Sequence, residues 1–135
     1  MKKTVSLCIA VMIAVCFTAC SKAESASTKE VVTGFFAAFE NSDYETMKEF
    51  CTKECIDTYF HEDDVDGMRW AKAIKIDDVY DKKSMEEHMY TFHVNVEMET
   101  VQNSAQFGQK QASFFVLLKQ DEEGSWKINS FLTGL

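Results

Sequence analysis

The chain has 135 residues, of which 14 are basic and 22 are acidic, and it contains no proline. Residues 1–20 include two lysines and no acidic residue, so the rest of the chain carries a net charge of about −10. A surface this acidic repels phosphate backbones, which argues against a nucleic-acid-binding protein. The length leaves room for one domain built around one hydrophobic core.

The N-terminal segment has the pattern of an export signal. Its basic start, Met1-Lys2-Lys3, precedes an apolar stretch over residues 5–19. That stretch is too short to span a bilayer as a helix, and it fits the apolar core of a signal peptide instead. Its end, Phe17-Thr18-Ala19-Cys20, resembles a bacterial lipobox, with phenylalanine where leucine is usual. In such proteins the cysteine receives a diacylglycerol thioether, and a signal peptidase cuts ahead of it.

This resemblance divides the chain into three parts. Residues 1–19 would be a lipoprotein signal peptide, cut between Ala19 and Cys20. Residues 20–27 would be a flexible tether that starts with the lipidated Cys20, and residues 28–135 the folded domain. The anchor would hold the domain at the extracytoplasmic side of the cell membrane, and two or more acyl chains would make that attachment stable. An ordinary secretory signal and an uncleaved anchor are the alternatives.

Helices are expected first in the folded domain. The segment Ser27-Thr28-Lys29-Glu30 has the spacing of a capping box, and apolar residues recur on one helical face after it. This pattern predicts a helix over residues 28–40. The segment Ser42-Asp43-Tyr44-Glu45 repeats the cap spacing and predicts a second helix. Thr52 is expected to cap a short third helix.

Strands are expected after Gly67, where the apolar period changes from that of a helix to that of a strand. Trp70, Ile74 and Ile76 indicate a first strand that runs to about Tyr80. A strict alternation then predicts a long second strand that is buried on one face. The apolar members of that alternation are Tyr90, Phe92, Val94, Val96 and Met98.

The C-terminal part of the chain predicts two further strands. Residues 112–119 form a continuous apolar run that suits a central strand covered on both sides. Residues 121–125 read as a hairpin turn, and Trp126, Ile128 and Leu132 alternate through the last strand. Helices followed by about four antiparallel strands make an α+β domain.

Two segments resemble a known superfamily. The opening from Val31 to Met47 is similar to the first helix and following turn of the NTF2-like (cystatin-superfamily cone) fold, and the ending Gly124-Ser125-Trp126-Lys127-Ile128 is similar to its closing strand. Within that superfamily the chain looks most like small lipoproteins of Gram-positive bacteria that are grouped as domains of unknown function. The resemblance implies helices packed on a bent antiparallel sheet, with a cavity between them. It implies no particular activity, because members include enzymes, transport factors and interaction modules.

Cys51 and Cys55 are the two cysteines expected in the folded domain. An extracytoplasmic location permits a disulfide. On a continuous helix, however, residues four apart hold their Cβ atoms about 5–6 Å apart, whereas a disulfide needs about 3.8 Å. A break near Thr52 would relax that objection. We expect two separately buried thiols, with a disulfide as the alternative, and no metal site, because no further ligand stands at a zinc-site spacing.

The densest acidic stretch is His61-Glu62-Asp63-Asp64-Val65-Asp66-Gly67. It reproduces the first half of an EF-hand loop, but Ala73 stands where the bidentate glutamate is required. A solvated acidic loop is therefore preferred over a calcium site.

Trp70, Tyr90 and His88 are the residues expected to line a pocket, since the three share the phase of the expected core. No carboxylate stands at a fixed offset that would orient His88, so no catalytic residue is assigned. No phosphate-binding loop, nucleophile elbow or metal-ligand cluster is present, and no cofactor is expected. The sequence thus favours a binding or interaction module for a small apolar ligand or a protein partner, including a second copy of the chain. A small acid–base enzyme that uses the cone cavity and a structural envelope domain without a ligand are the alternatives.

Overall fold

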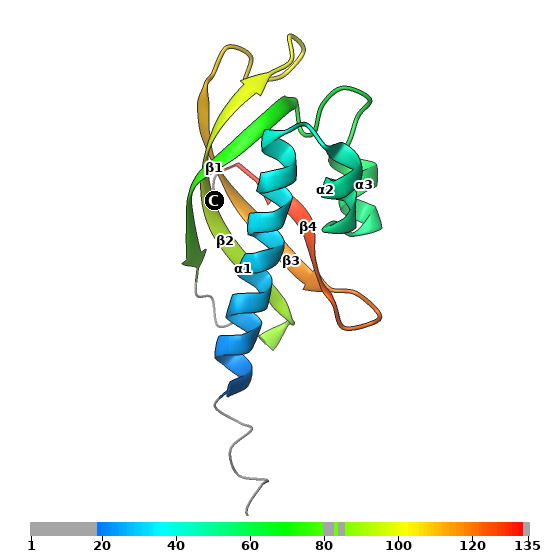
Figure 1. The fold of residues 1–135 in the computed structure, drawn as a ribbon, viewed down its shortest axis with the longest axis vertical. Coiled ribbons are helices and arrows are strands. Elements are labelled where there is room, and N and C mark those ends of the chain that lie inside the picture. The colour runs from blue at the N-terminus through cyan, green and yellow to red at the C-terminus, as the bar shows by residue number, and fades with distance from the viewer. Residues whose placement is uncertain (1–18, 80–82, 84–85, 134–135) are drawn as a thin grey trace, which may run out of the picture.

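The computed structural model describes residues 19–79, 83 and 86–133, and for residues 19–26 it describes the backbone alone. Within these residues the chain folds into helices followed by a four-stranded antiparallel sheet (Figure 1). This arrangement confirms the predicted α+β class. In Figure 1 the first helix crosses the sheet, and the two short helices lie beside its C-terminal strand.

The first helix, α1 (Ala19–Glu40), begins well before Thr28, where the capping box predicted its start. Ser27 therefore lies inside the helix, and the side chain of Thr28 is fully buried. Residues 19–33 contain neither glycine nor proline, so nothing in this stretch interrupts helical hydrogen bonding. The segment that was expected to be a flexible tether is thus helical in the structure.

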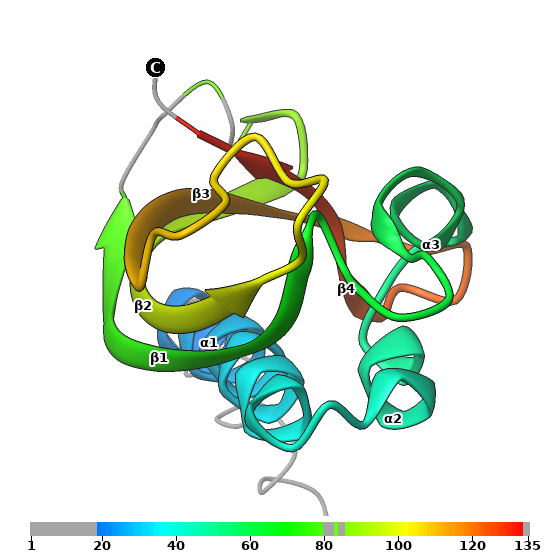
Figure 2. The ribbon, with the colours of Figure 1, turned by 90° about the horizontal axis from the view of Figure 1, so that it is seen from above.

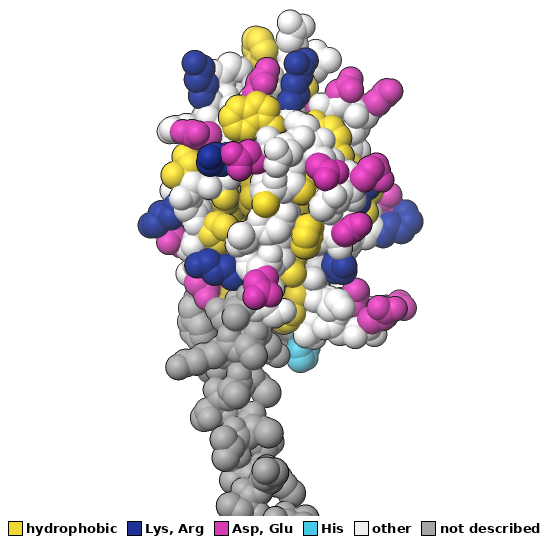
Figure 3. All heavy atoms as spheres, in the orientation of Figure 1, with side chains coloured by type: hydrophobic (Ala, Val, Ile, Leu, Met, Phe, Trp, Pro, Cys, Tyr) yellow, Lys and Arg dark blue, Asp and Glu magenta, His cyan; other side chains and the backbone are white. Residues whose placement is uncertain are grey.

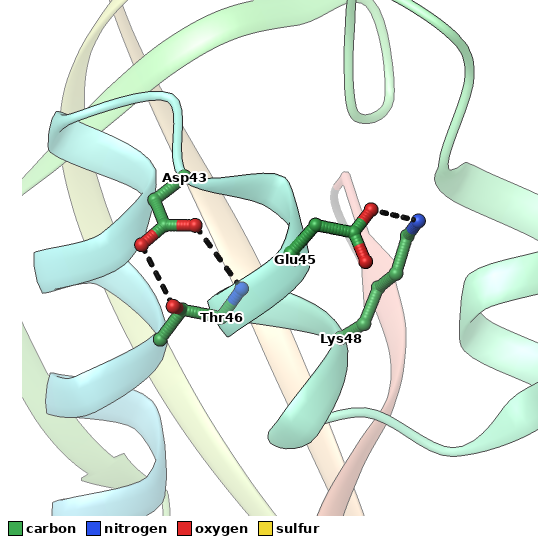
Figure 4. A network of polar contacts seen from close by, with 4 residues as sticks. All are labelled: Asp43, Glu45, Thr46 and Lys48. Atoms are coloured by element: carbon green, nitrogen blue, oxygen red, sulfur yellow. Dashed lines mark hydrogen bonds and ion pairs between the residues drawn. The ribbon is translucent and has the colours of Figure 1, made fainter.

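The second helix, α2 (Tyr44–Glu49), is capped by Asp43, one residue later than the predicted capping box. The Asp43 carboxylate accepts hydrogen bonds from the backbone N–H of Thr46, at 3.2 Å, and from its hydroxyl, at 2.7 Å (Figure 4). Glu45 pairs with Lys48 one turn further on, at 2.7 Å. Ser42 has a positive φ of 54° and donates its hydroxyl hydrogen bond to the carbonyl of Arg69, which ties this corner to the sheet.

The third helix, α3 (Lys53–Tyr59), is capped by Thr52 as expected. The Thr52 hydroxyl accepts a hydrogen bond from the backbone N–H of Cys55, at 3.1 Å, and donates one to Asn129 Oδ1, at 2.9 Å. One hydroxyl therefore caps the helix and joins it to the last strand.

The sheet has the order β1-β2-β3-β4, so each strand pairs with its sequence neighbour. The strands are β1 (Met68–Val79), β2 (Met89–Thr100), β3 (Gln111–Gln120) and β4 (Trp126–Leu132). The alternation predicted for β2 is confirmed, because all five apolar members of that pattern are buried. Strand β3 is central but covered fully on one face only, since Phe115 and Leu117 remain half-buried.

The core fills the space between α1 and the sheet. Helix α1 contacts both edge strands, β1 and β4, so the sheet curves around it, as Figure 2 shows from above. The ring centroids of Phe35 and Phe131 lie 5.4 Å apart and join α1 to β4. Phe39, Phe92 and Phe114 are also buried, and full burial of such a side chain contributes about 1.5–3 kcal/mol.

Helix α2 packs closely against α1 at Gly34. A Cβ atom at this position would lie 2.7 Å from Cζ of Phe50, which is closer than real Cβ contacts. The missing side chain at Gly34 therefore lets the ring of Phe50 lie against the helix backbone.

Candidate functional site

A cleft of about 570 Å³ opens where β2 turns into β3, and we call it the Trp70 cleft. Its lining includes Trp70 of β1, Met98 and Glu99 of β2, and residues 107–110 of the connecting loop. Volumes of this size are typical of small-molecule sites.

Two irregularities in β1 decide which of its side chains reach this cleft. The register shifts between Met68 and Trp70, and again between Ala73 and Lys75. The first shift buries Ala71 and moves Trp70 to the outer face of the sheet, where it pairs with Glu99. The predicted phase of β1, with Trp70 and Ile74 toward the core, is therefore wrong. Ile74, at the second shift, is 56% exposed.

The indole of Trp70 is fixed by a hydrogen bond across the strands. Its Nε1–H donates to Glu99 Oε2 at 3.0 Å. The ring is half-buried, so one part of it contacts protein and another part faces the cleft. A bound apolar molecule would contact a ring whose orientation is already set.

Phe107 also lines the Trp70 cleft and is 60% exposed. Its loop is held by backbone bonds: Phe107 N–H donates to the carbonyl of Ser104 at 3.0 Å, and Met98 N–H donates to the carbonyl of Lys110 at 2.9 Å. Gly108 N–H also donates to the hydroxyl of Thr100, at 3.2 Å. Phe107 is therefore an exposed side chain on a loop whose backbone is fixed. A ligand that covers its ring would bury apolar surface, which is favourable in free energy.

The cleft is rimmed by charges of both signs, with Glu97 and Glu99 on β2 and Lys110 on the loop. The face of the molecule in Figure 3 likewise shows acidic and basic side chains interspersed over the described residues, with apolar side chains between them. The lining of the cleft itself is mostly apolar, and this is the main feature that a ligand would meet.

A second cleft, of about 440 Å³, lies between residues 61–67 and the 101–106 loop, and we call it the Asp66 cleft. Burial raises the pKa of Asp66, the neighbouring carboxylate of Asp64 raises it further, and His61 opposes the shift. The amide oxygen Oε1 of Gln106 is buried there and has no hydrogen-bond partner among the described residues. The acidic loop is therefore only partly solvated, unlike the expected solvated loop.

The acidic loop packs tightly against the 101–106 loop at Gly67, which has a φ of +79°. Its N–H donates to Asp64 Oδ1 at 2.8 Å, and its carbonyl accepts a hydrogen bond from the N–H of Val101 at 2.9 Å. A Cβ atom at Gly67 would lie 2.5 Å from Ser104 Oγ. Among residues 19–79, 83 and 86–133, no group of three or more His, Cys, Asp or Glu side chains is arranged to hold a metal ion.

The structure does not bring the three expected pocket residues together. Trp70 pairs with Glu99 near the end of β2, whereas Tyr90 lies at the start of that strand. Tyr90 is 8% exposed and donates its hydroxyl hydrogen bond to Asp78 Oδ2 at 2.6 Å, so it belongs to the core. His88 is exposed at a turn with a φ of 54°. Neither Tyr90 nor His88 lines the Trp70 cleft.

Sequence reasoning missed Phe107, which is a lone aromatic residue among Gln, Asn, Ser and Gly. Such a loop composition predicts a turn but does not say which way its one aromatic side chain points. The isolated aromatic residue in a polar loop is the signal that could have marked it.

Cys51 and Cys55 are both buried and free, as predicted, but they are not separate. Hydrogen bonding to Cys55, together with burial, raises the pKa of Cys51, so the two thiols are neighbours. The chain breaks between α2 and α3, so the two cysteines do not share one helix.

The predicted signal peptide lies, apart from Ala19, outside the described residues. Cys20 falls in the part of α1 for which only the backbone is described, so its side chain is not placed. None of the helices formed by the described residues is both long and apolar enough to cross a membrane.

No protein-family model matches the chain. A comparison with curated proteins finds no significant relative either.

Proposed function

We propose that the chain is a lipid-anchored extracytoplasmic binding module with an NTF2-like cone, and that it takes a small apolar ligand in the Trp70 cleft. The observation that carries the proposal is the pair of incompletely buried aromatic side chains, Trp70 and Phe107, that line one cleft. The curvature of the sheet around α1 supports the cone. The lipobox-like segment that ends at Cys20 supports the anchor.

The position of the cleft relative to the expected anchor also supports this function. Helix α1 has 22 residues and begins at Ala19, and at 1.5 Å per residue it is roughly 33 Å long. Its last residue, Glu40, pairs with Lys72 of β1, close to Trp70 in the same strand. The β2–β3 loop, which lines the Trp70 cleft, lies beyond the C-terminal end of α1 (Figure 1), so an anchored domain would present the cleft away from the bilayer.

The ligand site can be tested with the neutral apolar dye N-phenyl-1-naphthylamine, using the Cys20→Ser chain, which cannot be acylated. We expect Phe107→Ala and Trp70→Ala to weaken dye binding about tenfold, which corresponds to ~1.4 kcal/mol. Leu132→Ala is the matched control, because Leu132 is 41% exposed but does not line the cleft. Equal binding by Phe107→Ala and the parent chain would refute the assignment.

The anchor can be tested separately by growing source cells with a labelled fatty acid. The label should enter the wild-type protein and be lost in Cys20→Ser, whereas Cys51→Ser should keep it. Label that persists in Cys20→Ser would contradict lipidation at Cys20.

A contact between two copies of the chain is a second candidate, favoured by the outer face of the sheet. Phe115 of β3 pairs with Leu132 of β4 on this face, and neither side chain is fully buried. Glu97, on the same face, would oppose a close approach of two copies at its end of the sheet. Sedimentation velocity would show a dimer that Leu132→Glu dissociates, and a monomer at all concentrations would exclude it.

A further inference from the structure

The backbone between Cys51 and Cys55 removes the geometric objection to a bond between them. Helix α2 ends at Glu49, Cys51 lies in the break after it, and Cys55 lies in the first turn of α3. The spacing of a continuous helix, which would hold their Cβ atoms too far apart, does not apply.

The segment that carries the two cysteines is fixed to β4 on both sides of the break. Thr52 N–H donates to the carbonyl of Ile128 at 2.9 Å, and Ile128 N–H donates to the carbonyl of Phe50 at 2.8 Å. Thr52 also holds Cys55 through the hydrogen bond from its N–H to the Thr52 hydroxyl. Backbone hydrogen bonds thus fix both the break that carries Cys51 and the first turn of α3 that carries Cys55.

The surroundings of Cys51 and Cys55 determine when a disulfide bond could form between them. Cys51 is 7% exposed and Cys55 is fully buried. Hydrogen bonding to Cys55, together with burial, raises the pKa of Cys51, so in the folded chain Cys51 is a thiol rather than a reactive thiolate at neutral pH. Exchange with an external disulfide is therefore expected before the pair is buried, and it should be slow afterwards.

We propose that Cys51 and Cys55 become joined by a disulfide when the chain folds in the presence of a disulfide oxidant. One thiolate attacks the oxidant and releases its first thiol, and the second cysteine then attacks the mixed disulfide and releases the other. The protein loses two hydrogens, and the oxidant is reduced to two thiols. The short loop that this bond closes restricts the unfolded chain little, so the disulfide fixes the α2–α3 junction locally.

The test uses the full chain, reduced and unfolded in denaturant, then refolded in a mixture of glutathione and glutathione disulfide. After alkylation and digestion with trypsin, cleavage at Lys53 separates Cys51 from Cys55. A disulfide would then join peptide 49–53 to peptide 54–69. We expect this linked pair and complete loss of alkylation at both cysteines.

Two results would overturn the proposal. One is alkylation of both cysteines in a chain that circular dichroism shows to be folded, and the other is a stable glutathione adduct on either of them. The chain that carries Cys8→Ser, Cys16→Ser and Cys20→Ser together is the control, because it should still give the linked peptides. Cys55→Ser should restore alkylation at Cys51, and this readout on digested peptides does not require the variant to fold.

A second measurement tests the role of burial. Glutathione disulfide added to the chain that was refolded in reducing buffer should form the linked peptides much more slowly than during refolding. Equal rates would refute the inference that the bond forms before the pair is buried.

Discussion

Trp70 donates its indole hydrogen bond to Glu99 across β1 and β2, at 3.0 Å, and this contact fixes the aromatic wall of the Trp70 cleft. We expect Glu99→Ala to release the indole and weaken binding of the apolar dye a few-fold, because an exposed hydrogen bond to a charged group contributes about 1 kcal/mol. The fluorescence of Trp70 should shift as well, and Trp126→Phe in both chains removes the second tryptophan signal.

Glu97→Ala is the matched control for Glu99→Ala. Glu97 lies on the same strand and lines the same cleft, but its carboxylate does not hold the indole. If both substitutions weaken dye binding equally, the general loss of negative charge, and not the orientation of Trp70, explains the effect.

A second prediction concerns the thermal stability of a variant at Gly34, over which the ring of Phe50 packs closely. Alanine normally stabilises a helix relative to glycine by about 1 kcal/mol. Here the added methyl group would collide with the ring, and overpacking costs typically about 1–3 kcal/mol. We expect Gly34→Ala to lower the midpoint of thermal unfolding.

The double substitution with Phe50→Ala checks the cause. Removing the ring should turn Gly34→Ala from destabilising to neutral or stabilising, which a double-mutant cycle would report as coupling. Additive effects would mean that the ring is not what Gly34 accommodates.

The raised pKa of Asp66 predicts how stability depends on pH. Because the folded state holds the Asp66 proton more tightly than the unfolded chain, the resulting stability is fully present below the unfolded pKa of about 3.8 and is lost as pH rises through the folded pKa. We therefore expect Asp66→Asn to raise the melting temperature at pH 7 and to leave it nearly unchanged at the lowest pH at which the chain stays folded. Asp63→Asn, at an exposed neighbouring position, should have little effect at either pH.

The hydroxyl of Thr52 caps α3 and bonds to Asn129, so its removal should destabilise the chain. Loss of such a cap costs about 0.5–2 kcal/mol. Urea unfolding should show this cost for Thr52→Ala and a much smaller one for Thr52→Ser, which keeps the oxygen. An equal cost for both would point to the lost methyl group.

The sequence predicts the strands of this fold better than it predicts the cleft. The alternation from Tyr90 to Met98 is confirmed because β2 is a regular inner strand, in which every second residue faces the core. In β1 the two register shifts interrupt this alternation. Trp70 and Ile74 therefore lie away from the core face on which the sequence pattern placed them. A bulge is set by how two strands pair, so one strand's own pattern does not reveal it.

The helix boundaries depended on competing local signals. Asp43 and Ser42 can both cap a helix, and the bond from Ser42 to the carbonyl of Arg69 in β1 leaves Asp43 as the cap. The capping box at Ser27 was not used, since a cap has no effect where the preceding residues continue the helix. Where a helix begins therefore depends on contacts between residues that are far apart in the sequence.

The sheet order has a consequence for folding kinetics. Each strand pairs with the strand before it, so three successive hairpins can form from neighbouring segments, each over a short stretch of chain. The contact of Phe35 with Phe131 instead joins the beginning of the domain to its end. With no proline in the chain, no slow prolyl isomerisation can delay this step. Closing the last strand onto α1 is therefore the event expected to set the folding rate.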